Sequence, residues 1–292
     1  MSSDLDKLLD YLEVQRIDKY LFIGDSPPQP PRIFGGQVLA QSLNSAIRTV
    51  DEERRAHSQH AYFLRPGNPE KQIVYEVDPI RDGKSFTTRR VVAKQDGIPI
   101  FNTTVSFQVE EEGLEHQFDP IDAPPPEEIE TDYDFWRRFA KENPDSKFTP
   151  PVPQSQPIER RSVHRRDPKK PQPSAPRSQT WFRACGDLGD DPCKHQTVLA
   201  FMSDFALLGT ALYPHPYGGM SPKVQGASLD HALWFHRPFR ADEYLLYEID
   251  SPTASGARGF SRGSFWTQDG QLVASTAQES LLRLRERKKP KA

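Results

Sequence analysis

Helical and strand-like apolar patterns follow one another in the first 110 residues. Four leucines within residues 5–12 lie at the spacing of one helical face, and a second helical set begins at Val38 after a glycine-rich segment. That set consists of Val38, Leu39, Leu43, Ala46, Ile47 and Val50. The pattern predicts a short amphipathic helix over the leucines, a strand near residues 20–23 and a longer helix from Gln37.

The pattern changes to that of strands between residues 57 and 107. Three segments in this region are rich in β-branched and aromatic residues, and Asp-Gly turns separate them. The segments are 73–77, 86–92 and 100–107. The turn at 95–97 is a candidate for a type I′ hairpin. This half of the chain therefore predicts a helix followed by an antiparallel meander.

The same order recurs in the second half, at a spacing of about 172 residues. Residues 60–66 are echoed by 231–238 with one insertion, and the Gln-Asp-Gly of 95–97 by that of 268–270. A nearly unbroken apolar segment at 201–212 predicts a fully buried helix. We therefore expect an α+β protein of two fused hotdog domains, each a buried central helix wrapped by a curved antiparallel β-sheet. Two unrelated α+β domains with coincidental matches are the alternative.

A proline-rich segment separates the two halves of the chain. Of its 28 prolines, 12 lie between Ile121 and Thr180, which predicts an extended connection. We expect an N-terminal hotdog domain at 1–120, a Pro-rich charged linker at 121–177, a C-terminal hotdog domain at 178–286 and a basic tail at 287–292.

Charge and cysteine content exclude several classes of protein. A formal net charge of -3 gives no global field that would attract nucleic acid. Cys185 and Cys193 are too few for a disulfide scaffold and match no zinc spacing, which favours reduced thiols in an intracellular compartment. No segment has the roughly 18 apolar residues of a membrane span, and residues 1–4 lack the start of a signal sequence. We expect a soluble intracellular protein.

Several segments together resemble the acyl-CoA thioesterase II (TesB-like) family of double hotdogs. They are 34–38, 57–67, 81–86, 228–239 and 274–279. The resemblance covers nearly all of both halves and fails only in the linker. It implies hydrolysis of medium- to long-chain fatty acyl-CoA to free fatty acid and coenzyme A, without a cofactor or metal, by a homo-oligomer.

The resemblance leaves the compartment open. Relatives of this kind often reside in peroxisomes, whereas this chain ends in Lys291-Ala292 and not in a Ser-Lys-Leu address. We expect a peroxisomal or cytoplasmic location.

The resemblance places a catalytic trio on Asp204, Ser228 and Gln278, all in the second repeat. Ser228 keeps the hydroxyl but lacks the methyl group that stiffens threonine at this position in other members. A water held by the three side chains would lose a proton to Asp204 as it attacks the thioester carbonyl. A thiolate leaving group, with a pKa of about 8.5 by analogy with cysteine, needs no strong general acid.

Each member of the trio also has an ordinary structural explanation. An aspartate in front of a buried helix is normally an N-cap, and Ser228 and Gln278 alone would be unremarked strand residues. Burial would raise the pKa of Asp204 and a helix N-terminus would lower it, so the sequence leaves the direction open.

The first repeat has Gly35-Gly36-Gln37 where we align Ser203-Asp204-Phe205 of the second, so we expect one working site per chain. Its glycines either pack the helix start closely on the sheet or let a ligand approach the backbone.

Two motifs compete with this interpretation. Residues 259–263 match the G-x-S-x-G nucleophile elbow of serine hydrolases, but a hairpin pattern follows where an elbow needs a helix. His231 and His236 could ligate a metal, yet no third ligand stands at a suitable spacing, which favours structural strand histidines.

Two other classes of function remain as alternatives. One is a catalytically inactive acyl-CoA-binding or scaffolding protein with a vestigial trio. The other is a hydratase, which would place a histidine beside the acid, and residues 202–208 contain none. The basic residues of the linker and of 283–291 suit coenzyme A phosphates or simple solvation, and the sequence singles out none of them.

Overall fold

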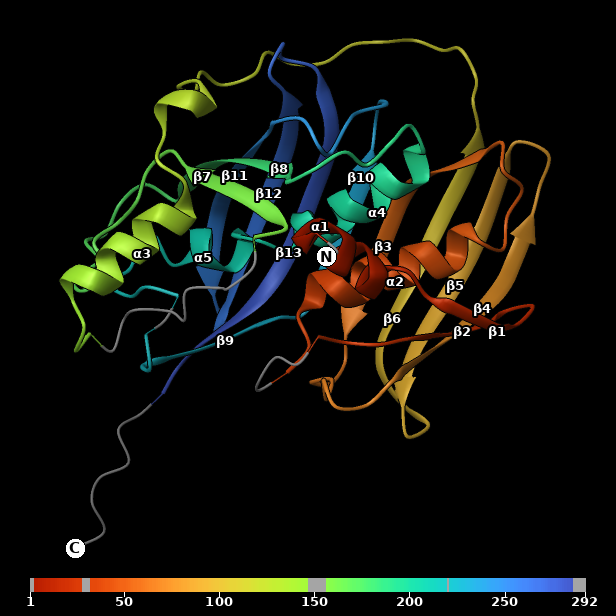
Figure 1. Ribbon diagram of the computed structural model, residues 1–292, viewed down its shortest axis with the longest axis horizontal. Coiled ribbons are helices and arrows are strands. Elements are labelled where there is room, and N and C mark those ends of the chain that lie inside the picture. Colours follow the sequence, from red (N-terminus) through yellow and green to blue (C-terminus); the bar gives the residue numbers. More distant parts are fainter. Residues whose placement is uncertain (1–2, 28–31, 147–155, 220, 286–292) are drawn as a thin grey trace, which may run out of the picture.

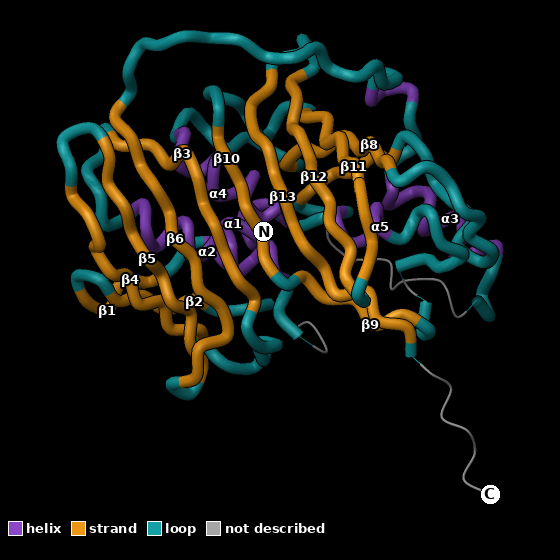
Figure 2. The backbone as a smooth tube through the Cα atoms, turned by 180° about the vertical axis from the view of Figure 1, so that it is seen from behind, coloured by secondary structure: helices purple, strands orange, loops and turns teal. Residues whose placement is uncertain are grey.

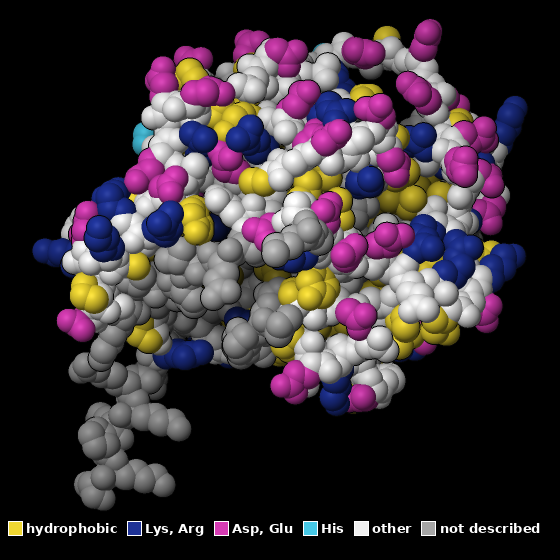
Figure 3. Space-filling model, viewed as in Figure 1, with side chains coloured by type: hydrophobic (Ala, Val, Ile, Leu, Met, Phe, Trp, Pro, Cys, Tyr) yellow, Lys and Arg dark blue, Asp and Glu magenta, His cyan; other side chains and the backbone are white. Residues whose placement is uncertain are grey.

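The two sequence repeats form two halves of one continuous antiparallel sheet. The computed structural model describes residues 3–27, 32–146, 156–219 and 221–285, and within them the sheet has 13 strands. Helices α1, α2 and α4 lie on one face of this curved sheet (Figure 1), and its other face is seen without covering helices in Figure 2. Acidic and basic side chains are mixed over the face viewed in Figure 3, in keeping with the small net charge.

The first half has the predicted helix and meander, with strand order β1-β2-β4-β5-β6-β3. Its elements are α1 (Asp4–Leu12), β1 (Gln15–Asp18), β2 (Leu21–Gly24), α2 (Gly35–Ile47), β3 (Arg54–Phe63), β4 (Ile73–Asp82), β5 (Phe86–Gln95) and β6 (Ile98–Val109). Helix α2 is buried around its circumference, with Leu39 and Leu43 fully inaccessible. The sheet covers the apolar side of this helix, and its polar side is also covered, where Gln41 hydrogen-bonds the Tyr11 carbonyl and the Tyr75 hydroxyl.

The second half repeats this plan in the order β10-β13-β12-β11-β8-β7, and β9 also pairs with β13. Its elements are η1 (Pro126–Glu128), α3 (Asp132–Glu142), β7 (Ile158–Ser162), β8 (Arg177–Ala184), α4 (Pro192–Ser203), α5 (Leu207–Ala211), β9 (Val224–Ser228), β10 (Asp230–Phe235), β11 (Leu245–Ser255), β12 (Arg258–Thr267) and β13 (Leu272–Leu284). Strands β3 and β10 pair at the joint, with His60 opposite Ala232. The expected α+β double hotdog is confirmed.

The two Gln-Asp-Gly turns differ in geometry. Asp96 and Gly97 both have positive φ, 49° and 76°, as a type I′ hairpin requires. The predicted type I′ turn at 95–97 is therefore confirmed. In the second turn only Gly270 has positive φ, and the strands end at Thr267 and resume at Leu272. The same Gln-Asp-Gly sequence therefore lies in a longer loop here and does not form a two-residue hairpin.

The buried helix of the second half lies earlier in the chain than predicted. Helix α4 ends at Ser203, and Ala206 adopts a left-handed φ of 70° before the short α5 begins. A single helix over 201–212 is therefore wrong. The helix start is marked upstream by Asp191, whose side chain accepts a hydrogen bond from the Cys193 amide, and by Pro192 in the first turn.

The connection between the halves is extended only as far as Pro125. It crosses one end of the sheet (Figure 2) and is held by Gln117, which hydrogen-bonds the backbone of Gly270 and Leu272. Beyond it, α3 and β7 are ordered elements inside the segment predicted to be a linker, and β7 extends the sheet beside β8. A uniformly extended linker is therefore wrong. The predicted tail at 287–292 lies outside the described residues.

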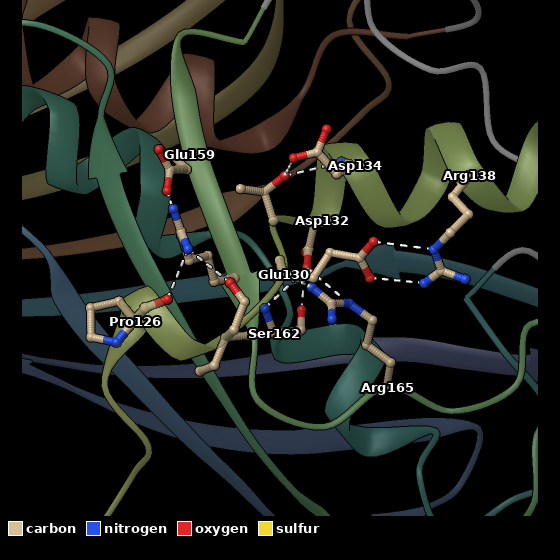
Figure 4. Close-up of polar contacts among 11 residues, drawn as sticks. Pro126, Glu130, Asp132, Asp134, Arg138, Glu159, Ser162 and Arg165 are labelled. Atoms are coloured by element: carbon tan, nitrogen blue, oxygen red, sulfur yellow. Dashed lines mark hydrogen bonds and ion pairs between the residues drawn. The ribbon is translucent and has the colours of Figure 1, made fainter.

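A polar cluster attaches α3 to β7 (Figure 4). Asp132, at the start of α3, accepts hydrogen bonds of 3.0 Å from both the amide and the hydroxyl of Ser162. It also forms a 2.7 Å ion pair with Arg165. Three partners on one carboxylate fix the position of the helix start more firmly than an exposed ion pair would.

We expect Asp132→Ala to release α3 locally without unfolding the sheet. Loss of a partly buried, charged hydrogen-bond acceptor costs about 1–3 kcal/mol, so amide hydrogen exchange in 132–142 should accelerate by about tenfold or more. Glu142→Ala, which removes only an exposed 3.9 Å pair with Arg138, is the control and should change little. Equal exchange rates in the two variants would contradict this role of Asp132.

Candidate active site

The site lies where the start of α2 meets the end of α4. Asp204 is the C-cap residue of α4, and the backbone amide of Gly36, in the first turn of α2, donates a hydrogen bond to its carboxylate. The alternative explanation of Asp204 as an N-cap does not hold, because the N-cap of the following helix is Ala206. One repeat supplies the carboxylate and the other supplies a helix N-terminus that faces it.

The three predicted site residues form a connected row. The Ser228 hydroxyl donates to Asp204 Oδ1 at 3.1 Å, and Gln278 Nε2 donates to the Ser228 oxygen at 3.1 Å. Ser228 is the last residue of β9, and Gln278 lies on the neighbouring β13. The sheet pairing thus brings Ser228 and Gln278 together, and the end of α4 adds Asp204.

Asp204 has the properties of a base that works near neutral pH. Asp204 is partly buried at the pocket wall, and desolvation there raises its pKa to about 7, while the hydrogen bonds from Ser228 and from the Gly36 amide oppose this rise. Desolvation exceeds the two hydrogen bonds, which answers the question that the sequence left open. A carboxylate with this pKa accepts a proton far more readily than an ordinary surface aspartate.

A pocket of about 610 Å³ opens beside Asp204 and Ser228. Its wall is mainly apolar and comes from both halves of the chain. The lining residues include Phe34, Val38, Phe63, Ile100, Leu208 and Leu229. Its charged and hydroxyl-bearing lining residues are Arg32, Arg65, Asp204 and Ser228. A mainly apolar pocket with a few polar groups is typical of a site that binds a ligand and orients it for reaction.

Two glycines permit the close approach of α2 to the carboxylate. A Cβ on Gly36 would lie 2.3 Å from the carbonyl oxygen of Phe201, and a Cβ on Gly35 would lie 2.6 Å from Asp204 Oδ2. Close packing is therefore one function of these glycines, and the partners are the end of α4 and, for Gly35, also Phe63 at the end of β3, 2.8 Å from the added Cβ. Only residues without a side chain fit at these two positions.

The alignment of residues 35–37 with residues 203–205 is not upheld by the topology. Helices α2 and α4 are equivalent, and their C-cap residues are Arg48 and Asp204. The glycines stand at the opposite end of the helix. Arg48 has a structural role in the first repeat, because its guanidinium donates a hydrogen bond to the Val14 carbonyl.

The equivalent place in the first repeat also lacks the amide. Val105 stands eight residues after Gly97, as Gln278 stands eight after Gly270. Arg89, opposite Val105, donates hydrogen bonds of 3.1 Å to the hydroxyl and the carbonyl of Thr49, just beyond α2. These replacements support the prediction of one working site per chain.

Comparison with known proteins agrees with this geometry. A family described as acyl-CoA thioesterase N-terminal domain matches residues 23–108, and one described as acyl-CoA thioesterase matches residues 152–281. Acyl-CoA thioesterase 2 of Haemophilus influenzae is 37% identical over 98% of this chain and 100% of its own length. The chain belongs to the acyl-CoA thioesterase family.

Further relatives span both halves of this thioesterase. Human acyl-coenzyme A thioesterase 8 is 40% identical over 94% of this chain and 88% of its own length. The crystal structure of acyl-CoA thioesterase II TesB2 from Mycobacterium marinum superposes with a TM-score of 0.78 at 40% identity, covering 95% of this chain and 98% of that one. The double-hotdog arrangement is thus shared with an experimentally determined member.

The competing motifs of the thioesterase have structural roles. Ser261, the serine of the G-x-S-x-G match, lies within β12 and donates a 2.8 Å hydrogen bond to the carbonyl of Leu207, so no nucleophile elbow is present there. His236 contacts Ser275 on the outer face. Among the described residues no group of three or more His, Cys, Asp or Glu side chains could hold a metal ion, and no helix is long and apolar enough to cross a membrane.

Sequence reasoning missed two contributors to the site. The Gly36 amide was not foreseen, because its contact with Asp204 depends on the packing of two helices from different repeats. His231 was interpreted as a structural strand histidine, but it contacts Gln278. Alternation along β10, where residues 231, 233 and 235 are buried, is the signal that places it on the inner face.

Proposed function

We propose that this thioesterase hydrolyses medium- to long-chain fatty acyl-CoA by direct attack of a water molecule that Asp204 activates. The observation that carries the proposal is the row from Asp204 through Ser228 to Gln278, beside an apolar pocket. The carboxylate is the base, the hydroxyl and amide fix its orientation, and the pocket suits an acyl chain.

In the proposed reaction the water oxygen bonds to the thioester carbonyl carbon while one water proton passes to Asp204. The resulting tetrahedral intermediate collapses by breaking the carbon–sulfur bond, and the coenzyme A thiolate leaves. Asp204 then passes its proton to the thiolate, directly or through solvent, which restores the carboxylate. The products are the fatty acid and coenzyme A.

The start of α2 supports the negative charge that develops on the carbonyl oxygen. The first backbone amides of a helix have no partner within the helix, and they carry the positive end of its dipole. In α2 the Gly36 amide donates to Asp204 and the Gln37 amide donates to the Phe34 carbonyl, so the Gly35 amide, at the pocket wall, is the donor proposed for the oxyanion. Donors aimed at an oxyanion are typically worth about 10²–10³ in rate.

Location and assembly belong to the same proposal. Of the two expected locations, peroxisomal and cytoplasmic, the first is supported by peroxisomal acyl-coenzyme A thioester hydrolase 1 of Saccharomyces cerevisiae, which is 24% identical over 95% of this chain. A homo-oligomer fits the sheet face that no helix covers (Figure 2), since β-sheet faces of this kind can pack against one another.

The pH dependence of hydrolysis tests the assignment of the base. Asp204 must be ionised to accept a proton, so with a pKa of about 7 we expect kcat/KM to rise about tenfold per pH unit below pH 7 and to level off above it. Free thiol released from acyl-CoA gives the rate.

The variant Ser228→Ala sharpens this test. It removes a hydrogen bond that lowers the pKa of Asp204, so the acidic limb of the profile should move to higher pH. A profile that is flat from pH 5.5 to pH 8, or a limb that moves to lower pH in Ser228→Ala, would contradict the assignment.

A further inference from the structure

His231 is a buried histidine that the proposed reaction does not use. It lies on β10 with only 1% of its surface exposed. Its Nδ1 is 2.8 Å from Gln278 Oε1, and its Nε2 is 2.9 Å from the Ser203 hydroxyl. Both ring nitrogens therefore contact residues next to the site, one on β13 and one in the last turn of α4.

The orientation of the Gln278 amide decides the direction of the whole row. With Nε2 toward Ser228, the amide donates to the Ser228 oxygen and leaves the hydroxyl proton free for Asp204. With the amide turned over, Oε1 would instead compete with Asp204 for that proton. Only the first orientation delivers a hydrogen bond to the carboxylate.

His231 is placed to select this orientation. Gln278 Oε1 can only accept a hydrogen bond, so the nitrogen that faces it, Nδ1, must carry the proton. Nε2 is then an acceptor, so the Ser203 hydroxyl, which lies 2.9 Å from both Nε2 and the Ala200 carbonyl, must turn its single proton toward the ring. Burial lowers the pKa of His231 to about 4, so the ring stays neutral near neutral pH and keeps one tautomer.

We propose that His231 is a positioning residue that fixes the amide orientation of Gln278, and through it the hydrogen bonds to Ser228 and Asp204. This inference rests on the proposed function, because it requires Gln278 to act in the trio. The row thus has four members, and the fourth never meets the substrate.

A Ser–His nucleophile pair is the obvious alternative use of these groups. Ser203 is fully inaccessible, and neither it nor His231 is among the residues that line the pocket. A hydroxyl buried in this way cannot reach a thioester. The Ser203 contact therefore holds the ring in place and performs no chemistry.

The first repeat provides an internal comparison. Strand pairing makes Gln59, and not the exposed His60 of the sequence echo, the equivalent of His231, because Gln59 lies opposite Val105 as His231 lies beside Gln278. Gln59 donates to the Leu39 carbonyl of α2 and does not serve an amide on the neighbouring strand, where Val105 replaces the glutamine. The repeat without the trio thus lacks both the amide and the histidine that orients it.

Two conservative variants separate the two contacts of the ring. An asparagine amide reaches the place of Nδ1 and keeps the donor for Gln278, whereas a glutamine amide reaches the place of Nε2 and keeps only the Ser203 contact. We expect His231→Gln to lower kcat by about tenfold to a hundredfold with little change in KM, and His231→Asn to stay within about threefold of wild type. A purely structural role would give the reverse order, with Asn the less stable variant in thermal unfolding.

The Gln278→Ala variant distinguishes failure of this inference from failure of the proposed function. If Gln278→Ala keeps full activity, the trio itself is wrong. If it loses activity while His231→Gln does not, only the role of His231 is wrong. We expect the double variant to be no worse than Gln278→Ala alone, because both changes act on one hydrogen bond, and multiplying losses would overturn the inference.

A spectroscopic measurement needs no variant. Nitrogen-15 chemical shifts of histidine distinguish a protonated Nδ1 from a protonated Nε2. We expect the His231 ring of the wild-type protein to be neutral with the proton on Nδ1 at pH 7. A neutral ring with the proton on Nε2 would contradict the inference, because Nδ1 could not then donate to Gln278.

Discussion

Asp204→Asn should lower kcat/KM for acyl-CoA hydrolysis by about 10²–10⁴-fold, the usual contribution of a general base. Asparagine keeps the shape of the side chain and can still accept the Ser228 hydrogen bond, but it cannot take a proton from water. The measurement is the rate of free thiol release at pH 8, where the wild-type carboxylate is ionised. Asp250→Asn, which removes an exposed ion pair with Arg262, is the matched control and should leave the rate unchanged.

The stability of the same variant, relative to wild type, should increase as the pH rises. Burial raises the folded-state pKa of Asp204 from 3.8 to about 7, so ionisation of this group disfavours the fold. The cost is absent below pH 4, grows between pH 4 and 7, and is complete above pH 7. We expect the unfolding free energy of Asp204→Asn, relative to wild type, to be on the order of 2–4 kcal/mol higher at pH 8 than at pH 4.

Loss of activity without this change in relative stability would show that Asp204 is not the desolvated carboxylate described above. An Asp204→Asn protein that folds and retains activity within about tenfold of wild type would remove Asp204 from the chemistry altogether.

Gly36→Ala should reduce both stability and activity. Its Cβ would lie 2.3 Å from the Phe201 carbonyl oxygen, which belongs to the backbone of α4 and cannot rotate away. Overpacking of this kind typically costs about 1–3 kcal/mol, and separating α2 from α4 would also lengthen the hydrogen bond from the Gly36 amide to Asp204. We expect a lower melting temperature together with a fall in kcat of about tenfold or more.

Gly209→Ala provides the control for helix propensity. Gly209 lies in α5, and an added Cβ would meet no atom within 4 Å. Alanine is better than glycine in a helix by about 1 kcal/mol, so this variant should be as stable as wild type or slightly more stable. If Gly36→Ala behaved like Gly209→Ala, close packing of α2 against α4 would not be what positions Asp204.

The packing of α2 against α4 explains why this chain needs two repeats for one site. A helix start and a helix end meet because equivalent helices of the two halves lie side by side beneath one sheet. The positive end of α2 faces the carboxylate at the end of α4. Neither half alone contains both groups, so the site depends on the joint between β3 and β10.

Periodicity was enough to predict the double hotdog but not the break in its second helix. Apolar residues at 201–212 match a buried helix and a buried helix–turn–helix equally well, since both present apolar surface on all sides. The turn is fixed by the left-handed Ala206, and alanine gives no warning of such a conformation. For this reason the sequence placed Asp204 in front of the buried helix, whereas it lies at the end of α4.

Side-chain partners across repeats were likewise beyond the sequence. The resemblance named Asp204, Ser228 and Gln278, and the structure brings these three together. The Gly36 amide and the His231 ring depend on the relative placement of α2, α4 and β10, which no local pattern encodes. Charge content also could not show that Asp132 anchors a helix within the predicted linker.

The most direct test of water activation by Asp204 is a single turnover with enzyme in excess over a long-chain acyl-CoA, in which coenzyme A and fatty acid are quantified in the same quenched samples. Direct attack of water predicts that both products form with one shared rate constant and that no acyl group is bound covalently to the protein. A burst of coenzyme A ahead of the fatty acid would show an acyl-enzyme intermediate, and bound acyl-CoA with no release of coenzyme A would show a binding protein; either result would contradict the mechanism.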